Sequence, residues 1–481
     1  MPPRVDVLVI GAGAAGLPAA IFASRLGARV LVVESTDRIG GTFHYSSGQM
    51  SAAGTRVQAL KGIHDTPDLH YQDVMRISRG TADPALTRLA VDHAADTLHW
   101  LIDQGLQVLP EHPIIHFGHA PYRIPRTYWA REEGRAVLAA MLPEYRRAEA
   151  AGLIETWCGT SLASLRQDAS GAVTGARLVR QGATSEIAAG AVILATGGFA
   201  ANPAMFAEFS AHPLHGGGNP ANQGEGLTAA LAVGGHLAHR DAFLPSFAAV
   251  ASPGALGNVT LETITNPSYR RPWEVYLDLA GRRFLAEDTR DLDIRERALR
   301  DLDQMAFWVV YDETVRRAAP ALFPTLPESE LATRFATLPG YVRADSLAAL
   351  AQATGMDEAT LRASLATYNA CLDADEPDPL GRTYRPVPLR HPPFHAVRHV
   401  GWSVVSWAGL AVDGRLRVLA DNGTVIPGLY AAGEILGLGA TSGDAFVSGM
   451  SVTPAMTFGR LLGLRLGVAN RTAGMRLEAG I

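Results

Sequence analysis

The first 34 residues carry the pattern that most restricts the fold of this chain. An apolar run over 5–10 leads directly into the turn Gly11-Ala12-Gly13-Ala14-Ala15-Gly16, an Ala-rich stretch through Ala28 and a second apolar run over 30–33. Strand, glycine turn, helix and strand in this order are typical of a βαβ unit that binds a dinucleotide. The sequence therefore predicts a Rossmann-like parallel sheet that begins at the N-terminus.

Each glycine of this turn has its own task in such a unit. Gly11 makes the turn, Gly13 lets a pyrophosphate approach the backbone, and Gly16 lets the helix pack on the strand. The helix N-terminus then faces the phosphates. Glu34 ends the second strand about 20 residues further on, where a carboxylate accepts hydrogen bonds from ribose hydroxyls. Either NAD or FAD satisfies this motif.

The domain organisation follows from the length of the chain and from changes in residue composition along it. The chain has 481 residues, and single cores stop growing near about 250–300 residues, so we expect two domains. Strand-and-glycine patterns near 178–198 and 428–434 flank a region of Pro-rich loops with helical stretches over 295–302 and 346–372. We predict an α/β fold: a dinucleotide-binding domain in two pieces, 1–238 and 405–481, with an inserted α+β cap over 239–404.

Charge and cysteine content exclude several kinds of partner. A net charge of −5 without a basic stripe argues against nucleic acid. Cys158 and Cys371 are too few for a disulfide framework, an iron–sulfur cluster or structural zinc. Prolines prevent a helical face at His112, His116 and His119, so we interpret these as loop histidines and expect no metal. Without a long apolar run or a signal-peptide pattern, we expect no membrane span and a cytoplasmic location.

Further glycine motifs recur along the chain in a fixed order. They are Arg38-Ile39-Gly40-Gly41-Thr42, Ala195-Thr196-Gly197-Gly198-Phe199-Ala200, Gly224-Glu225-Gly226-Leu227 and Gly428-Leu429-Tyr430-Ala431-Ala432-Gly433-Glu434. With the first turn, this set resembles the flavoprotein family of fumarate reductase and succinate dehydrogenase over nearly the whole length. It is most similar to the soluble branch with flavocytochrome c fumarate reductase and the 3-ketosteroid dehydrogenases. The resemblance implies non-covalent FAD and a cap that closes over a small-molecule substrate.

The resemblance also implies which residues lie along FAD. The carboxylate at the end of the second strand meets the adenosine ribose, the second and third motifs lie by the pyrophosphate and the adenine half, and a Ser-Gly pair lies near the isoalloxazine. A final helix aims its N-terminus at the flavin, where its dipole stabilises negative charge, although an ordinary capped helix gives the same sequence. The expected FAD residues are Gly11, Gly13, Ala15, Gly16, Glu34, Ser35, Gly40, Gly41, Thr42, Ser47, Gly48, Thr196, Gly197, Gly433, Glu434, Ser451 and Val452.

Four residues are candidates for catalysis. The segment 281–291 resembles the cap segment that carries an Arg proton donor, but it is one residue shorter, so Arg290 is either that donor or a surface ion-pair residue. Gly449 lies in a segment that resembles the one whose glycine N–H polarises a ketone in 3-ketosteroid dehydrogenases. Tyr122 and Tyr128 lie in a segment that aligns with a substrate-facing loop, and stacking in the core is the alternative. Phe446 occupies the position of the family's second active-site Arg, so a dicarboxylate substrate is not expected.

The expected reaction is hydride transfer on a CH–CH pair. Our first expectation is a FAD-dependent dehydrogenase that desaturates a carbonyl-activated substrate, such as a cyclic ketone or keto acid, and passes electrons to a diffusible acceptor. A reductase of an activated alkene, in the manner of fumarate or urocanate reductases, is the alternative within enzymes. A non-catalytic flavin-binding protein is the alternative of another class. The sequence leaves substrate identity and oligomeric state open.

Overall fold

The chain folds into two compact units. The computed structural model describes residues 4–210, 212–251 and 259–478. Unit 1 comprises Met1–Ala211, Gly218–Phe243 and Val404–Ile481, and unit 2 comprises His212–Gly217 and Leu244–Ser403. The assignment of 239–404 as a substrate cap stays a prediction.

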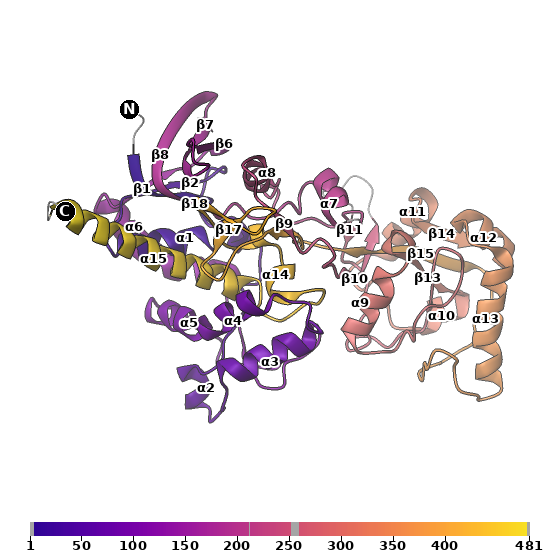
Figure 1. Ribbon diagram of the computed structural model, residues 1–481. Coiled ribbons are helices and arrows are strands. Elements are labelled where there is room, and N and C mark those ends of the chain that lie inside the picture. Colours follow the sequence, from indigo (N-terminus) through magenta and orange to yellow (C-terminus); the bar gives the residue numbers. More distant parts are fainter. Residues whose placement is uncertain (1–3, 211, 252–258, 479–481) are drawn as a thin grey trace. The chain divides into compact units, whose positions relative to one another are not determined.

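An eight-stranded mixed sheet forms the centre of unit 1 (Figure 1). Five strands pair in parallel in the order β18-β8-β1-β2-β5, with β17 antiparallel at one edge and the β6–β7 hairpin joined to β8. The early, middle and late parts of the chain thus share one sheet, and the predicted α/β class is confirmed. The strands are β1 (Arg4–Ile10), β2 (Val30–Val33), β5 (Ile154–Trp157), β6 (Thr160–Gln167), β7 (Val173–Arg180), β8 (Ala183–Leu194), β17 (Arg417–Leu419) and β18 (Val425–Ala431).

The central strands are continuous apolar runs because both faces of the sheet are covered. The last four residues of β1 and all four of β2 are buried. Strand β2 has the bounds expected from the apolar run over 30–33. Two short pairs of strands lie outside the large sheet: β3 (Met50–Ser51) with β4 (Thr127–Tyr128), and β9 (Leu237–Ala238) with β16 (Gly409–Leu410).

Helices of unit 1 pack on its sheet and on one another. None of the helices in the described part of the chain is long and apolar enough to span a membrane. The unit 1 helices are α1 (Gly16–Ser24), α2 (Arg56–Leu60), α3 (Pro67–Ile77), α4 (Pro84–Asp92), α5 (Ala94–Asp103), α6 (Glu133–Ala150), α7 (Pro203–Ser210), α8 (Glu225–Ala232), α14 (Gly439–Ser442) and α15 (Val452–Glu478).

Helices α1 and α15 pack closely against each other (Figure 1). Every residue of α1 is buried. We call Gly459, Gly463 and Gly467 of α15 the glycine seam. A Cβ at Gly459 would lie 2.0 Å from Ala15 O, and one at Gly463 would lie 2.4 Å from Ala19 O. The seam therefore needs glycine, and it ties the C-terminal helix to the helix that follows the first glycine turn.

Unit 2 is built on a six-stranded sheet in which all described pairings are antiparallel. Its strands are β10 (Ser246–Ala251), β11 (Val259–Thr260), β12 (Val275–Leu277), β13 (Ala306–Tyr311), β14 (Tyr341–Ala344) and β15 (Phe394–Trp402). Its helices are α9 (Leu292–Arg300), α10 (Glu313–Ala318), α11 (Glu328–Thr337), α12 (Leu347–Thr354) and α13 (Glu358–Asp373).

Several expected helices have different bounds in the structure. The stretch over 346–372 is two helices, because Gly355 ends α12 with φ +78° and Asp357 caps the start of α13 by accepting from Thr360 N–H. Gly at a C-cap and Asp at an N-cap are ordinary stop and start signals. The final helix expected from the sequence is α15, which extends from Val452 to Glu478.

The charged run Arg295-Glu296-Arg297 suggests a solvated helix face, and this interpretation is wrong. Arg295, Glu296 and Arg297 are buried, with at most 9% of their surface exposed. The Arg295 guanidinium donates to the carbonyl oxygens of Glu287 (2.8 Å) and Thr265 (2.9 Å) and lies 4.1 Å from the ring centroid of Phe247. Carbonyl acceptors and an aromatic face replace water around this charge.

Candidate active site

The glycine turn after β1 leaves several backbone donors unpaired. Gly11 has φ +103°, and a Cβ there would lie 2.2 Å from Ala195 O, so only glycine fits. Ala12 N–H donates to Glu34 Oε2 (3.0 Å). Other N–H groups of this turn donate to no other described residue; they are those of Gly13, Ala14 and Ala15. Free donors at the start of a helix fit a pyrophosphate, as expected for FAD.

Glu34 is fixed at the carboxyl end of β2. It is only 6% exposed. Its Oε1 accepts from Thr36 N–H (2.9 Å) and Thr36 Oγ1–H (2.8 Å), with Ser35 Oγ at 3.4 Å. The carboxylate is thus oriented by its own loop and by the glycine turn, and lone pairs remain for ribose hydroxyls.

The second glycine motif lies directly against the first. Gly40 N–H donates to Ala12 O (2.8 Å). A Cβ at Gly41 would lie 3.1 Å from Gly13 Cα. Gly41 also begins the 3₁₀ turn over 41–44 that contains Thr42, and His44 Nε2 in this turn bonds to Ile39 O (3.0 Å).

Asn222 connects the motif over 195–200 with the motif over 428–434. Gly197 has φ +76°, and a Cβ there would lie 2.6 Å from Asn222 Oδ1, while Thr196 lies against Gly226 at the start of α8. Asn222 Nδ2 donates to Glu434 Oε2 (3.2 Å).

Glu434 is a half-buried carboxylate that links three segments of unit 1. Ser406 donates to its Oε1 through N–H (3.0 Å) and through Oγ–H (3.1 Å). Burial raises the pKa of Glu434, and the hydrogen bonds from Ser406 and Asn222 oppose this shift. The preceding Gly433 has φ +89° and lies against Ala15, so this motif reaches the first turn. A contact of Glu434 with FAD stays a prediction.

A second helix N-terminus in unit 1 offers free donors. The N–H groups of Ser451 and Val452, at the start of α15, donate to no other described residue. Thr453 Oγ1 accepts from Ser51 N–H (2.9 Å), which joins this helix to strand β3. Such a terminus suits negative charge on a reduced flavin.

The peptide between Ser448 and Gly449 is held at both of its polar ends. Gly449 has φ +75°, and a Cβ there would lie 2.4 Å from Ser51 N. Gly449 N–H donates to Gln49 Oε1 (3.1 Å), and Ser448 O accepts from Tyr122 OH (2.5 Å). The N–H expected to polarise a ketone is therefore already bonded to a side chain.

Gln49 itself follows two of the expected flavin residues. Ser47 is exposed, whereas Gly48 is buried with φ +63°, and a Cβ there would lie 2.7 Å from Gly134 N. Close packing of this loop on the start of α6 fixes where Gln49 emerges.

Both candidate tyrosines are buried and hydrogen-bonded. Tyr122 is 3% exposed and Tyr128 is 1% exposed. Tyr128 OH lies 2.6 Å from Thr55 Oγ1. Burial raises the pKa of both phenols. Each phenol therefore stays neutral at physiological pH and is a poor base.

Arg126 and His70 surround Tyr122 in the interior. Arg126 is fully buried and pairs with Asp65 (2.8 Å) and Asp73 (2.9 Å). His70 Nε2 lies 3.3 Å from Tyr122 OH, and Nδ1 of this fully buried ring has no partner among the described residues. Burial, and then the charge of Arg126, hold the pKa of His70 well below its usual range.

His70 and Gln49 were missed from the sequence. His70 shares the buried face of α3 with Asp73, Val74 and Ile77. Polar residues on the apolar face of an expected helix were the available signal for a buried network. Gln49 carried no comparable signal, because its partner Gly449 lies 400 positions away in the chain.

Arg290 lies in unit 2 and is exposed. The segment before it is anchored by Arg283, which pairs with buried Glu287 (2.7 Å) and Asp378 (2.6 Å). The residue after it, Asp291, caps α9. Arg290 itself makes no ion pair with any residue that the structure describes, so the alternative of a surface ion-pair residue finds no support.

The loop histidines pack on aromatic rings. His112 and His116 stand edge-on to Trp129, with centroids 5.4 and 5.0 Å away. His119 stacks on Phe446 at 4.5 Å, so the loops that carry Tyr122 and Gly449 meet a second time at this aromatic pair. Within the described ranges, no group of three or more His, Cys, Asp or Glu residues is arranged to hold a metal ion.

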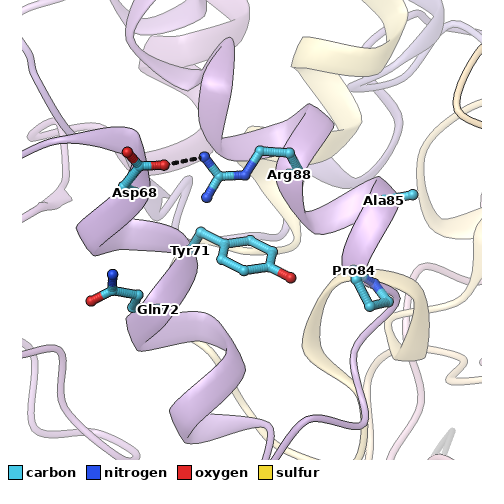
Figure 2. A pocket seen from close by; sticks show the side chains of 6 residues that line it. All are labelled: Asp68, Tyr71, Gln72, Pro84, Ala85 and Arg88. Carbon is cyan, nitrogen blue, oxygen red and sulfur yellow. Dashed lines mark hydrogen bonds and ion pairs between the residues drawn. The ribbon is translucent and has the colours of Figure 1, made fainter.

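A surface hollow lies on helices α3 and α4 (Figure 2). Arg88 pairs with Asp68 (2.6 Å) and lies 4.3 Å from the ring centroid of Tyr71. None of the residues expected to contact FAD lines this hollow; its lining is Asp68, Tyr71, Gln72, Pro84, Ala85 and Arg88.

Comparison with known proteins decides the family. Residues 6–445 match the FAD binding domain family. The chain belongs to this family. Its cofactor is FAD, and the chain is an oxidoreductase of the fumarate-reductase-like group, as the glycine motifs indicated.

Three relatives illustrate the range of this group. The chain is 30% identical to the NADH:fumarate oxidoreductase of Klebsiella pneumoniae (strain 342), over 96% of this chain but 47% of that protein, so it spans about half the length of that relative. It is 27% identical to the vinyl phenol reductase of Lactiplantibacillus plantarum, with 89% of each chain covered. The 3-ketosteroid Δ1-dehydrogenase structure from Sterolibacterium denitrificans shares the fold, with a TM-score of 0.75, 22% identity, and coverage of 97% of this chain and 100% of that one.

Proposed function

We propose that this protein uses FAD to reduce an activated carbon–carbon double bond in a small substrate. The double bond is conjugated to a carbonyl group, and the end of the substrate that meets Phe446 is uncharged. When bound, FAD supplies the hydride. The flavin must be in its reduced form to do so, and it would return to oxidised FAD as it gives up two electrons; one proton from the protein would complete the reduction, so that the alkene gains two hydrogens.

The protonation state of the two candidate tyrosines supports reduction of a double bond over desaturation. Desaturation needs a base that removes a proton next to the carbonyl. Tyr122 and Tyr128 are neutral, buried and hydrogen-bonded within the protein, so neither supports that role. Relatives named as reductases of fumarate and of vinyl phenol support the same direction.

Arg290 is our proposed proton donor. A guanidinium is protonated at any physiological pH, so it suits donation better than abstraction of a proton. The side chain is exposed and has no ion-pair partner among the described residues. A paired carboxylate would stabilise the charged guanidinium and oppose proton transfer, and no carboxylate of the described residues is paired with Arg290.

Phe446 supports a substrate without a second carboxylate. The centroid of its ring lies 4.5 Å from that of His119 and 5.0 Å from that of Trp407, so its surroundings are aromatic. A carboxylate at an apolar surface without a paired cation loses hydration without compensation. We therefore propose enones and similar uncharged conjugated carbonyl compounds as the substrate class.

The test is anaerobic stopped-flow spectroscopy of the photoreduced holoenzyme. We expect 2-cyclohexen-1-one to reoxidise the flavin faster than fumarate does. Arg290→Gln is expected to slow this step by roughly 100-fold or more, the usual contribution of general acid catalysis. Arg282→Gln is the matched control, because Arg282 is an exposed arginine of the same segment. Equal rates in the two variants would remove Arg290 from the mechanism.

Dehydrogenation of a ketone is the second candidate. The backbone N–H of Gly449 favours it, provided that Gln49 moves away to free this donor. Saturated cyclic ketones would then bleach the oxidised flavin, and enones would leave the reduced flavin unchanged. No response to either class would favour a non-catalytic flavin-binding protein.

The proposal also needs a partner that exchanges electrons with the flavin. We propose a diffusible two-electron donor, together with non-covalent FAD. Release of FAD into the supernatant after acid precipitation tests this point.

A further inference from the structure

Hydrogen bonds in unit 1 form a chain that runs from the interior to a free amide. His70 Nε2 lies 3.3 Å from Tyr122 OH, and Tyr122 OH donates to Ser448 O (2.5 Å). The N–H of the same peptide, on Gly449, donates to Gln49 Oε1 (3.1 Å). Because a backbone N–H can only donate, the oxygen of Gln49 must face Gly449.

The other end of the Gln49 side chain is therefore a pair of N–H donors. Gln49 Nε2 makes no hydrogen bond to any residue in the described part of the chain, and the side chain is half-buried. A donor that is neither fully solvated nor paired is available to a ligand oxygen. Strand β3, which follows Gln49 directly, is held to the start of α15 by the bond from Ser51 N–H to Thr453 Oγ1.

We propose that the Gln49 carboxamide donates a hydrogen bond to the carbonyl oxygen of the substrate, and that Tyr122 and His70 are positioning residues that hold it through the 448–449 peptide. This inference rests on the proposed function, because it names the group that polarises the conjugated carbonyl. Electron withdrawal toward that oxygen makes the β-carbon a better hydride acceptor, and the donor stabilises the negative charge that develops there.

The direction of the bonds supports this role. A hydrogen bond from Tyr122 to Ser448 O polarises the peptide and makes the Gly449 N–H a stronger donor. That bond in turn polarises the Gln49 amide, so its N–H groups also become stronger donors. Burial, followed by the positive charges of Arg126 and Arg88, lowers the pKa of His70 and keeps the ring neutral. The nearby carboxylate of Asp73 is paired with Arg126, so this series of hydrogen bonds persists across physiological pH.

Gln49→Met tests the donor, because methionine has a similar length but no N–H group. The reoxidation of photoreduced flavin by 2-cyclohexen-1-one is expected to slow by roughly 100-fold, the usual cost of losing one such donor. The Kd of the enone for the oxidised holoenzyme, from the flavin difference spectrum, should rise by less than about 10-fold. Gln72→Met is the matched control, because Gln72 is exposed on α3.

A vibrational measurement separates polarisation from packing. In the oxidised holoenzyme, Raman difference spectra should show the C=O stretch of bound enone shifted to lower wavenumber. Gln49→Met should abolish the shift, and Tyr122→Phe should reduce it while leaving the Kd within about 3-fold of the wild-type value. Gln49→Glu, a carboxylate without donors, should behave as Gln49→Met does.

The outcomes for this inference and for the proposed function are distinct. If the wild type reduces enones and Gln49→Met does so at the wild-type rate, the role of Gln49 is overturned and the proposed function stands. If the wild type binds carbonyl ligands with a Gln49-dependent Raman shift but reduces no alkene, the proposed function fails and the donor role stands. If no carbonyl compound binds, both are wrong.

Discussion

A side chain added to the glycine seam should destabilise unit 1 and weaken FAD binding. A Cβ at Gly463 would lie 2.4 Å from Ala19 O, 2.9 Å from Ala23 N and 2.9 Å from Phe22 Cβ. Two of these three atoms are backbone atoms that cannot rotate away, so the helices must separate by about 1 Å to restore van der Waals distance. Gly463→Val adds two further methyl groups, and we expect a loss of about 3 kcal/mol from overpacking.

Thermal unfolding is the assay for this prediction. For a unit of this size, about 3 kcal/mol corresponds to a fall in Tm of roughly 6 °C. Arg465→Val is the matched control on the same helix, since Arg465 is exposed and the change costs less than about 1 kcal/mol in helix propensity. The variant at the seam should also release FAD faster, because α1 carries the glycine turn at its N-terminus. Equal Tm values for Gly463→Val and Arg465→Val would refute the close packing of the seam.

Three further predictions concern charges and protons. Glu34→Gln should raise the Kd for FAD by about 10–100-fold in titrations of the apoenzyme, because a charge-assisted hydrogen bond is lost. Asp37→Asn, at an exposed residue, should change this Kd little. Arg126→Met leaves Asp65 and Asp73 without their buried cation, so the free energy of unfolding, measured by urea denaturation, should fall by about 3–5 kcal/mol. Arg123→Met, at an exposed residue, should have a small effect. Burial lowers the pKa of His399 to about 4, so the unfolded chain takes up a proton at this residue near pH 6.5 and the folded protein does not. The free energy of unfolding should therefore fall by about 1.4 kcal/mol per pH unit as the pH drops from 6.5 to 4, and this component should vanish in His399→Gln.

The cofactor half of the protein could be predicted because its signals are local. Strand β1, the turn from Gly11 to Gly16 and strand β2 lie within a single stretch of sequence. The close backbone contacts of Gly11 and Gly16 match the roles that the motif assigns to these two glycines. Glu34 follows at the spacing that the ribose contact requires. The family and FAD followed from the order of such motifs.

The substrate half resisted prediction because its contacts are distant in sequence. Tyr122 was a candidate for chemistry, but its bond to Ser448 O, which indicates a positioning role, joins residues 326 positions apart. The charges of Arg295 and Glu296 suggested solvent, yet both side chains are buried, and Thr265 O and Phe247 surround Arg295 only after folding. Charge patterns report what a side chain can pair with and contain no information about which carbonyl oxygens will surround it.

The sheet of unit 1 has a consequence for the order in which the chain is synthesised. Strand β8 ends at Leu194, but its neighbour β18 begins only at Val425. At about 5–20 residues per second, roughly 10–50 s pass before that strand leaves the ribosome. Until then residues 192–194 of β8 lack the strand that later pairs with them, although β7 already pairs with residues 183–188. The last strand of the unit 2 sheet, β15, is completed before β18 is made. An unpaired apolar edge is a template for aggregation. The nascent flavoprotein therefore passes through a period in which this edge is exposed. Chaperone protection of the edge, or slow translation after unit 2, affects the yield of folded protein more than the stability of the finished fold affects that yield.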